Sequence, residues 1–189
     1  MRVGVLALQG NYFQHKQMCA RLGVQVNLIK YPHQLDKICA LIIPGGESSV
    51  ISKLIEKNNF REAIINFSKV KSIFGTCAGM ILLSSTKKSS HVAPLNVMDF
   101  TIDRNAWGRQ VDSFSAHVSL RELKKSFYTY FIRSPRIKRK GNKIKVLAFY
   151  ENEPVLLTDG RHLAASFHPE IGNDMRIHQY FIKNLYESS

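Results

Sequence analysis

Short apolar runs alternate with amphipathic segments along the first half of the chain. The runs have the continuous apolar character of strands buried on both faces, and they occupy residues 2–8, 24–29, 41–43 and 72–74. Helices are predicted between and after them, at residues 11–22, 48–57, 60–69 and 80–83. Asn11 is suited to cap the first helix, and Gly23 to end it. Strands that alternate with helices predict a parallel α/β sheet with right-handed crossovers.

The second half has a different pattern, in which strands follow one another. We predict these strands at residues 99–101, 111–118, 128–132, 144–150, 154–158 and 163–167. The pair Asp159-Gly160 is a hairpin turn signal, and residues 174–186 read as a closing amphipathic helix. Because no repeat, low-complexity tract or linker divides the chain, we expect one domain over residues 1–189.

The composition agrees with a single globular domain. Of the 189 residues, 44% are apolar and 22% charged, unlike a disordered chain. No apolar run approaches the roughly 20 residues that span a bilayer, and we read no signal peptide at the N-terminus. Three cysteines, Cys19, Cys39 and Cys77, are too few and unpaired for a disulfide framework or a zinc site, so a cytoplasmic location is expected. The first two read as inert packing thiols.

The formal charge of +13 is large for a chain of this size. It is densest after Phe131, at Arg133, Arg136, Lys138, Arg139, Lys140, Lys143 and Lys145. This segment reads as a loop leading into a strand, and no zinc-finger, helix-turn-helix or aromatic RNA-binding signature accompanies it. We therefore expect neither a nucleic acid nor a membrane as partner. A solvated basic surface and a docking surface for an acidic protein remain as interpretations.

The string Gly75-Thr76-Cys77-Ala78-Gly79 has the form glycine–x–nucleophile–x–glycine at a predicted strand-to-helix junction. Such a tight turn leaves little room for side chains at its flanks, hence the two glycines. It would raise the Cys77 thiol to the top of the sheet, at a helix N-terminus that favours the thiolate. Alone, the string fits a plain turn around a buried cysteine equally well.

Two further motifs follow predicted core strands. Pro44-Gly45-Gly46-Glu47-Ser48 offers backbone N–H groups that an oxyanion hole requires, although a plain loop with Ser48 as helix cap also explains it. In His168-Pro169-Glu170, the proline favours an extended histidine, so that His168 and Glu170 point the same way. A base oriented by a carboxylate is what thiol activation uses. Since catalytic groups gather at the carboxyl ends of strands in open sheets, the three motifs predict one site.

With these motifs the chain resembles class I glutamine amidotransferases, and more closely the family of glutaminase subunits of pyridoxal phosphate synthase. The cysteine and His-Pro-Glu motifs are shared by the wider class. Two blocks resemble the narrower family, Arg104-Asn-Ala-Trp-Gly-Arg-Gln-Val-Asp-Ser-Phe114 and Phe131-Ile-Arg-Ser-Pro135. Further matches are Leu8-Gln9-Gly10 and residues 41–48, 74–79 and 166–170. The similarity spans nearly the whole chain, with departures at 84–95, at 121–127 and in the basic residues after Pro135.

The resemblance implies a role for each matching residue. Cys77 would be the nucleophile, His168 the general base and Glu170 the carboxylate that orients it. The backbone N–H groups of Gly46 and Ala78 would form the oxyanion hole. The residues that bind glutamine would be Gly46, Glu47, Ser48, Arg104, Ile132 and Arg133. The chemistry agrees for the two arginines, because a guanidinium group matches a carboxylate.

The resemblance also implies a flavodoxin-like three-layer α/β/α fold whose mixed central sheet carries extra antiparallel strands. L-Glutamine would be hydrolysed to glutamate and ammonia through a Cys77 thioester, without metal or organic cofactor. The ammonia would pass to a synthase subunit in a hetero-oligomeric complex. One alternative is a glutaminase subunit of another amidotransferase, such as imidazole glycerol phosphate synthase, against which residues 104–114 argue. A related cysteine peptidase or chaperone lacks the His-Pro-Glu arrangement, and the intact triad argues against a catalytically silent binding module.

Overall fold

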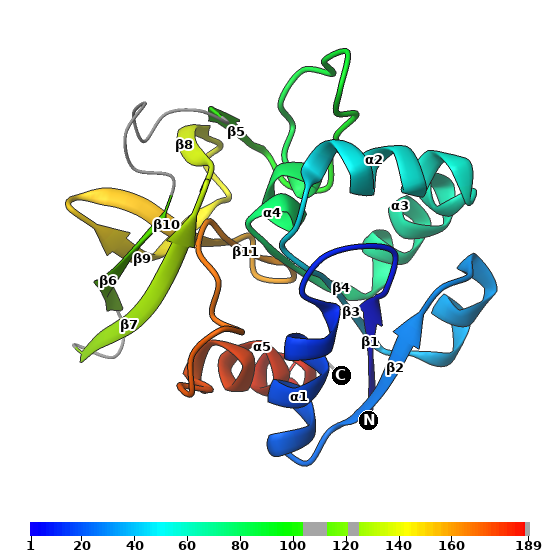
Figure 1. Ribbon diagram of the computed structural model, residues 1–189, viewed down its shortest axis with the longest axis horizontal. Helices are drawn as coiled ribbons and strands as arrows, with labels where there is room; N and C mark the ends of the chain where they lie inside the picture. Colours follow the sequence, from blue (N-terminus) through cyan, green and yellow to red (C-terminus); the bar gives the residue numbers. More distant parts are fainter. Residues whose placement is uncertain (104–112, 121–124, 188–189) are drawn as a thin grey trace.

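A nine-stranded sheet forms the centre of the computed structural model, which describes residues 1–103, 113–120 and 125–187 (Figure 1). In spatial order its strands are β2 (Gln25–Ile29), β1 (Arg2–Leu6), β3 (Ala40–Ile43), β4 (Ser72–Thr76), β11 (Leu163–Ala165), β10 (Glu153–Thr158), β9 (Lys145–Tyr150), β6 (Ser113–Leu120) and β7 (Lys125–Ile132). The first five strands in this order pair in parallel, and the later pairs are antiparallel. The sheet is therefore mixed, as predicted.

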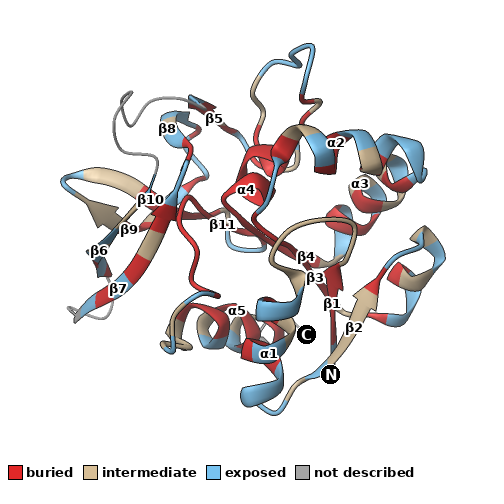
Figure 2. Cartoon of the chain, viewed as in Figure 1, coloured by how far each residue is buried: buried red, intermediate tan, exposed pale blue. Residues whose placement is uncertain are grey.

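Helices cover both faces of the parallel half of the sheet (Figure 1). One face carries α1 (Tyr12–Arg21) and α5 (Arg176–Glu187), and the other carries α2 (Ser48–Lys57), α3 (Phe60–Val70) and α4 (Ala78–Leu83). Successive residues of β3 point to opposite faces: Leu41 and Ile43 join the core beneath α2, α3 and α4, whereas Ala40 and Ile42 join the core beneath α1 and α5. Strands β1, β3, β4 and β11 are largely buried between these helix layers, and the outer strand β2 is mostly half-buried (Figure 2). The predicted three-layer fold is confirmed.

The parallel register brings the carboxyl ends of the central strands to one edge. Ile43 at the end of β3 pairs with Gly75 in β4, and Thr76 pairs with Ala165 at the end of β11. The loop 44–47, the cysteine turn and the segment 166–170 therefore emerge side by side, as expected for the catalytic edge of an α/β sheet.

The basic segment after Pro135 is a strand, and our prediction of a loop at this place was wrong. The strand, β8 (Arg136–Lys140), pairs antiparallel with β5 (Phe100–Asp103) in a small second sheet. All its side chains are exposed except that of Ile137, which is partly buried. A strand with almost no apolar face has no period-two pattern from which to predict it.

Three smaller differences concern local structure. A 3₁₀ helix, η1 (Pro32–Lys37), was not predicted. The last strand ends at Ala165 rather than at residue 167, because His168 instead forms an isolated antiparallel bridge with Tyr130 of β7. Helix α5 begins at Arg176, two residues later than predicted. Among the described helices, none combines the length and apolar character needed to cross a membrane.

Candidate active site

The turn at Cys77 has the geometry of a nucleophile elbow. Between β4 and α4, Cys77 adopts φ 46° and ψ −101°, a conformation that costs a non-glycine residue about 1–3 kcal/mol. Its backbone is held on both sides, since its N–H donates to the carbonyl of Ala165 (2.8 Å) and its own carbonyl accepts from Ile81 N–H (3.1 Å). A Cβ on Gly79 would lie 2.0 Å from the carbonyl oxygen of Ile43. Close packing therefore requires glycine at this flank of the turn.

His168 and Glu170 lie beside this turn, and both side chains are almost completely buried. The imidazole Nδ1 of His168 lies 2.7 Å from Oε1 of Glu170. The backbone N–H of His168 donates to the carbonyl of Tyr130 (2.8 Å), which fixes the histidine against β7. Gly45 packs so closely on the ring that a Cβ there would lie 2.3 Å from its Cε1. The imidazole is therefore clamped between β7 and the loop after β3.

The two groups support each other's charge. Burial lowers the pKa of His168, but the nearby Cys77 and the hydrogen-bonded carboxylate of Glu170 outweigh burial and raise this pKa to about 10. Burial raises the pKa of Glu170, but interactions with His15, His168 and Asn11 outweigh it and lower this pKa to about 2. At neutral pH, carboxylate and imidazolium are thus both charged. A positive imidazole beside a thiol favours the reactive thiolate.

A cavity of about 640 Å³ opens in front of these groups. Its lining includes both Cys77 and His168, and five of the residues predicted to bind glutamine or the oxyanion: Gly46, Glu47, Ser48, Ile132 and Arg133. The thiol of Cys77 donates to the carbonyl of Ile132 (3.6 Å). Ala78 and Glu170 are buried outside the lining, and Glu170 lies behind the histidine. Arg104 lies outside the described residues. The structure thus brings the predicted nucleophile, base and loop to one cavity.

Residues 5–187 match the model of the SNO glutamine amidotransferase family. The chain belongs to this family. The prediction from the cysteine and His-Pro-Glu motifs, that the chain is a glutamine amidotransferase, is confirmed by this match.

Relatives within the glutamine amidotransferases are similar over almost the full length. The pyridoxal 5'-phosphate synthase subunit PdxT of Thermosipho africanus (strain TCF52B) is 42% identical over 185 residues, which cover 96% of this chain and 97% of that protein. PdxT of Francisella tularensis subsp. tularensis (strain WY96-3418) is 44% identical over 181 residues with the same coverage. A crystal structure of a glutamine amidotransferase has a TM-score of 0.91 at 38% identity, covering 97% of this chain and 98% of that one.

A fourth similarity concerns the fold alone. The structure of PurLQS from Thermotoga maritima has a TM-score of 0.67 at 14% identity, covering 99% of this chain and 96% of that one. The fold of the glutamine amidotransferases is therefore retained where most of the sequence differs.

Residues that we did not predict hold the site together from the N-terminal side. Asn11 was expected to cap α1, but its side chain makes no capping bond and instead donates to Oε1 of Glu170 (3.0 Å). Gln9 Oε1 accepts the backbone N–H of Glu47 (2.9 Å), which ties the loop after β1 to the loop after β3. The match of residues 8–10 to the family was a signal for the contact of Gln9 with Glu47. No sequence feature indicates that an Asn placed to cap a helix instead binds a distant carboxylate.

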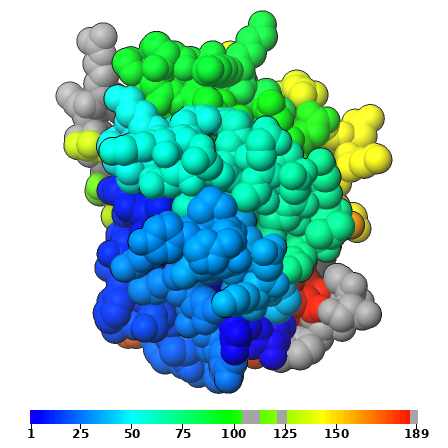
Figure 3. Space-filling view, turned by 90° about the vertical axis from the view of Figure 1, so that its right-hand side faces the viewer, coloured from blue at the N-terminus to red at the C-terminus, as the bar shows by residue number. Residues whose placement is uncertain are grey.

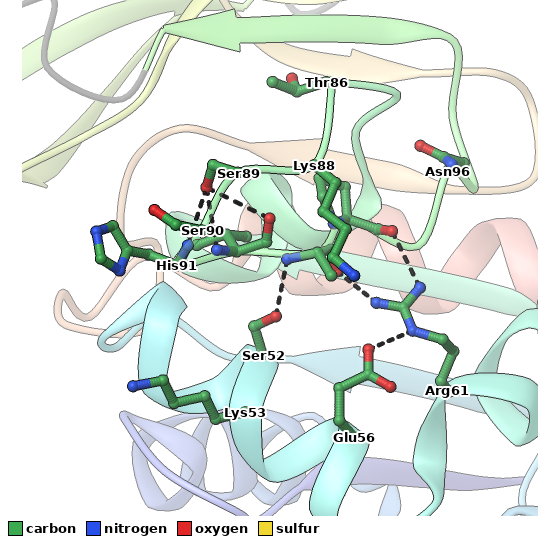
Figure 4. Close-up of a pocket in the computed structure, with 13 residues that line it drawn as sticks. Ser52, Lys53, Glu56, Arg61, Thr86, Lys88, Ser89, Ser90, His91 and Asn96 are labelled. Carbon is green, nitrogen blue, oxygen red and sulfur yellow. Dashed lines mark hydrogen bonds and ion pairs between the residues drawn. The ribbon is translucent and has the colours of Figure 1, made fainter.

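The divergent segment 84–95 borders a different cavity, also of about 640 Å³ (Figure 4). This second cavity lies between α2 and segment 84–95, and the segment forms the top of the face shown in Figure 3. The second cavity shares no lining residue with the cavity at Cys77. Arg61 is fully engaged there with Glu56 and the carbonyls of Ala93 and Pro94. Among the described residues, no group of three or more His, Cys, Asp or Glu side chains is placed to hold a metal ion.

Replacing Cys77 by alanine should abolish glutamine hydrolysis, because no other group in the cavity can form the thioester. The fold should survive, since the change is small and keeps the backbone bonds of the elbow. Ammonia release and thermal unfolding measure the two outcomes. Cys19→Ala is the matched control: burial raises the pKa of this thiol to about 12, so it is inert and its loss should spare turnover. Near wild-type ammonia release by Cys77→Ala would exclude the mechanism.

Replacing His168 by asparagine should lower kcat by roughly 10²–10⁴-fold, the usual contribution of a positioned acid–base group. Glu170→Gln should lower kcat less, because the role expected of this carboxylate is to orient the imidazole, without proton transfer to the substrate. Steady-state kinetics with glutamine compare the two. His117→Asn, at an exposed position of β6, is the control. The assignment is wrong if His168→Asn retains full kcat or if the control loses it.

Proposed function

We propose that the chain is the glutaminase subunit of a pyridoxal 5'-phosphate synthase, with Cys77, His168 and Glu170 as its catalytic triad. The observation that carries the proposal is the arrangement of these groups at one cavity. A strained turn presents the Cys77 thiol there, and the buried carboxylate of Glu170 stabilises the protonated imidazole of His168. The printed names of the relatives at 42% and 44% identity support the choice of synthase. No observation favours imidazole glycerol phosphate synthase or a silent binding module.

The reaction begins with the Cys77 thiolate and the His168 imidazolium. The thiolate attacks the side-chain amide carbon of glutamine, and backbone N–H groups of Gly46 and Ala78 receive the negative oxygen. His168 gives its proton to the leaving nitrogen, so that ammonia departs and a thioester remains. The neutral imidazole then takes a proton from water, whose oxygen attacks the thioester. Glutamate leaves and the ion pair is restored.

Charges at the mouth of the cavity suit an amino acid. Arg133 lines the cavity with an exposed side chain and a backbone φ of 46°, and its guanidinium group would bind the carboxylate of glutamine. Glu47 lies on the opposite loop and would contribute the negative charge that an ammonium group requires. Ser48, Ile132 and Arg104 complete the proposed binding set. We propose one glutaminase domain over residues 1–189, located in the cytoplasm.

Ammonia release from glutamine, measured with and without the synthase subunit of a pyridoxal 5'-phosphate synthase, tests the proposed function. We expect stimulation when the two are combined, and incorporation of ¹⁵N from amide-labelled glutamine into pyridoxal 5'-phosphate. Cys77→Ala in the same mixture should release no ammonia, while free ammonium salt should still support synthesis. Equal stimulation by an unrelated synthase, or no incorporation of ¹⁵N, would contradict the choice of partner.

The basic surface offers a second test, of how the synthase subunit docks. Lys138 and Arg139 are exposed on β8, and Arg139 pairs with Asp99 (2.7 Å). If these charges attract an acidic partner, Lys138→Gln/Arg139→Gln/Lys140→Gln should slow association at low ionic strength and leave intrinsic chemistry intact. Stopped-flow association at two salt concentrations measures this. Lys53→Gln/Lys57→Gln on α2 is the control, and equal rates for both variants and wild type would favour an idle, solvated surface.

A further inference from the structure

Two histidines lie fully buried behind the proposed triad. His15 comes from α1 and His178 from α5, the neighbouring helices on one face of the sheet (Figure 1). His15 Nδ1 lies 2.9 Å from His178 Nε2. On the other side of the ring, His15 Nε2 lies 3.1 Å from Thr76 Oγ1 and 3.5 Å from Oε2 of Glu170. A continuous row of polar groups therefore connects α5 with the carboxylate of the triad.

The chemistry of these groups decides where their protons lie. Oε2 of Glu170 has no hydrogen-bond partner, and an ionised carboxylate can only accept, so Nε2 of His15, 3.5 Å away, can donate toward it only if this nitrogen carries the proton. Burial lowers the pKa of both rings, that of His178 to about 3, so that each ring is neutral with one proton. His15 Nδ1 then accepts from Nε2–H of His178. This assignment leaves a bare lone pair at His178 Nδ1, which has no partner, whereas the opposite tautomers would leave a buried N–H there.

The second contact of His15 leads to the glycine loop. Thr76 precedes the nucleophile and is fully buried. Its hydroxyl oxygen accepts the backbone N–H of Gly45 (3.0 Å), in the loop that carries the proposed oxyanion donor Gly46. Through one hydroxyl, the imidazole of His15 is thus linked to this loop as well as to the carboxylate.

We propose that His15, held by His178 with its proton on Nε2, is a positioning residue that fixes the Glu170 carboxylate and the Gly45 peptide relative to each other. It touches neither the substrate nor the thiol. It acts on His168 through Glu170, and on the glycine loop through Thr76. The inference rests on the proposed function, because it assigns a role behind the same triad.

If His15 and His178 only filled space in the core, apolar side chains would serve better at these positions. Phe74 lies edge-on to both rings, with centroids 6.1 Å from His15 and 5.7 Å from His178, and the surrounding core is apolar. An apolar side chain would fill such a place without the penalty of burying polar atoms. Two neutral imidazoles aligned from α5 to Glu170 instead suit a hydrogen-bond donor that must point in one direction, toward the carboxylate.

The variants His15→Leu and His15→Gln distinguish the two roles. Both remove the ring, but only glutamine can donate toward Glu170 and accept from His178. In the complex with the synthase subunit, we expect His15→Leu to lower kcat for glutamine hydrolysis about 10–100-fold, with KM within about threefold, by analogy with the loss on removing a group that orients a metal-binding side chain. His15→Gln should recover most of kcat. An unchanged kcat in His15→Leu, or equal losses in both variants, would overturn the proposal.

His162 provides the matched control. It is also buried, and its Nδ1 accepts the backbone N–H of Ile73 (3.1 Å). This contact lies near the amino ends of β4 and β11, at the end of these strands away from the site. His162→Leu should lower Tm but leave kcat unchanged. If it lowers kcat as much as His15→Leu does, loss of stability explains both effects and the positioning role is excluded.

A measurement on the unsubstituted protein covers the case in which His15→Leu does not fold. Long-range ¹H–¹⁵N NMR spectra should show His15 and His178 neutral across the neutral pH range, each protonated at Nε2. A proton on Nδ1 of His15 would overturn the proposal. Failure of the proposed function gives a different result, because the unsubstituted protein would then show no stimulated glutamine hydrolysis, or Cys77→Ala would still hydrolyse glutamine, whatever the His15 variants do.

Discussion

The buried carboxylate of Glu170 is the constraint on which the site depends. An ionised carboxylate leaves water only at a large cost in free energy unless hydrogen bonds and opposite charge replace its hydration. Its partners come from distant parts of the chain: Asn11 is 159 residues away, and His15 lies in the helix that begins directly after Asn11. His168 supplies the positive charge. The buried charge is therefore compensated only once the N-terminal and C-terminal segments have come together.

Much of the fold could be predicted because the buried strands are short and continuously apolar, as in β3. The cysteine turn and the pair His168 and Glu170 were predictable for local reasons, since glycines flank a tight turn and a proline keeps the histidine extended. The basic strand β8 has almost no buried side chain to create a pattern. The row from His178 to His15 joins residues 163 positions apart, and a histidine inside a helix looks the same in sequence whether it faces solvent or a carboxylate.

The two halves of the sheet contribute differently to the site. The parallel half supplies the glycine loop, the elbow and the segment with the base, because the ends of its strands meet at one edge. Among the described residues, the antiparallel half supplies none of the proposed triad, yet it borders the cavity through Ile132, Arg133 and Ser113. Substrate contacts of the proposed site thus come from both halves of the sheet, whereas the proposed triad comes from the parallel half.

Strand β7 links these two parts through its backbone. The carbonyl of Tyr130 holds the N–H of His168, and two residues later the carbonyl of Ile132 lies beside the thiol of Cys77. Two carbonyls of one strand thus contact the residues proposed as nucleophile and base. A single inserted or deleted residue between these carbonyls would turn one of them to the opposite side. For the proposed triad, the register of β7 near its end therefore matters through these two backbone contacts, whereas segment 84–95 borders a separate cavity.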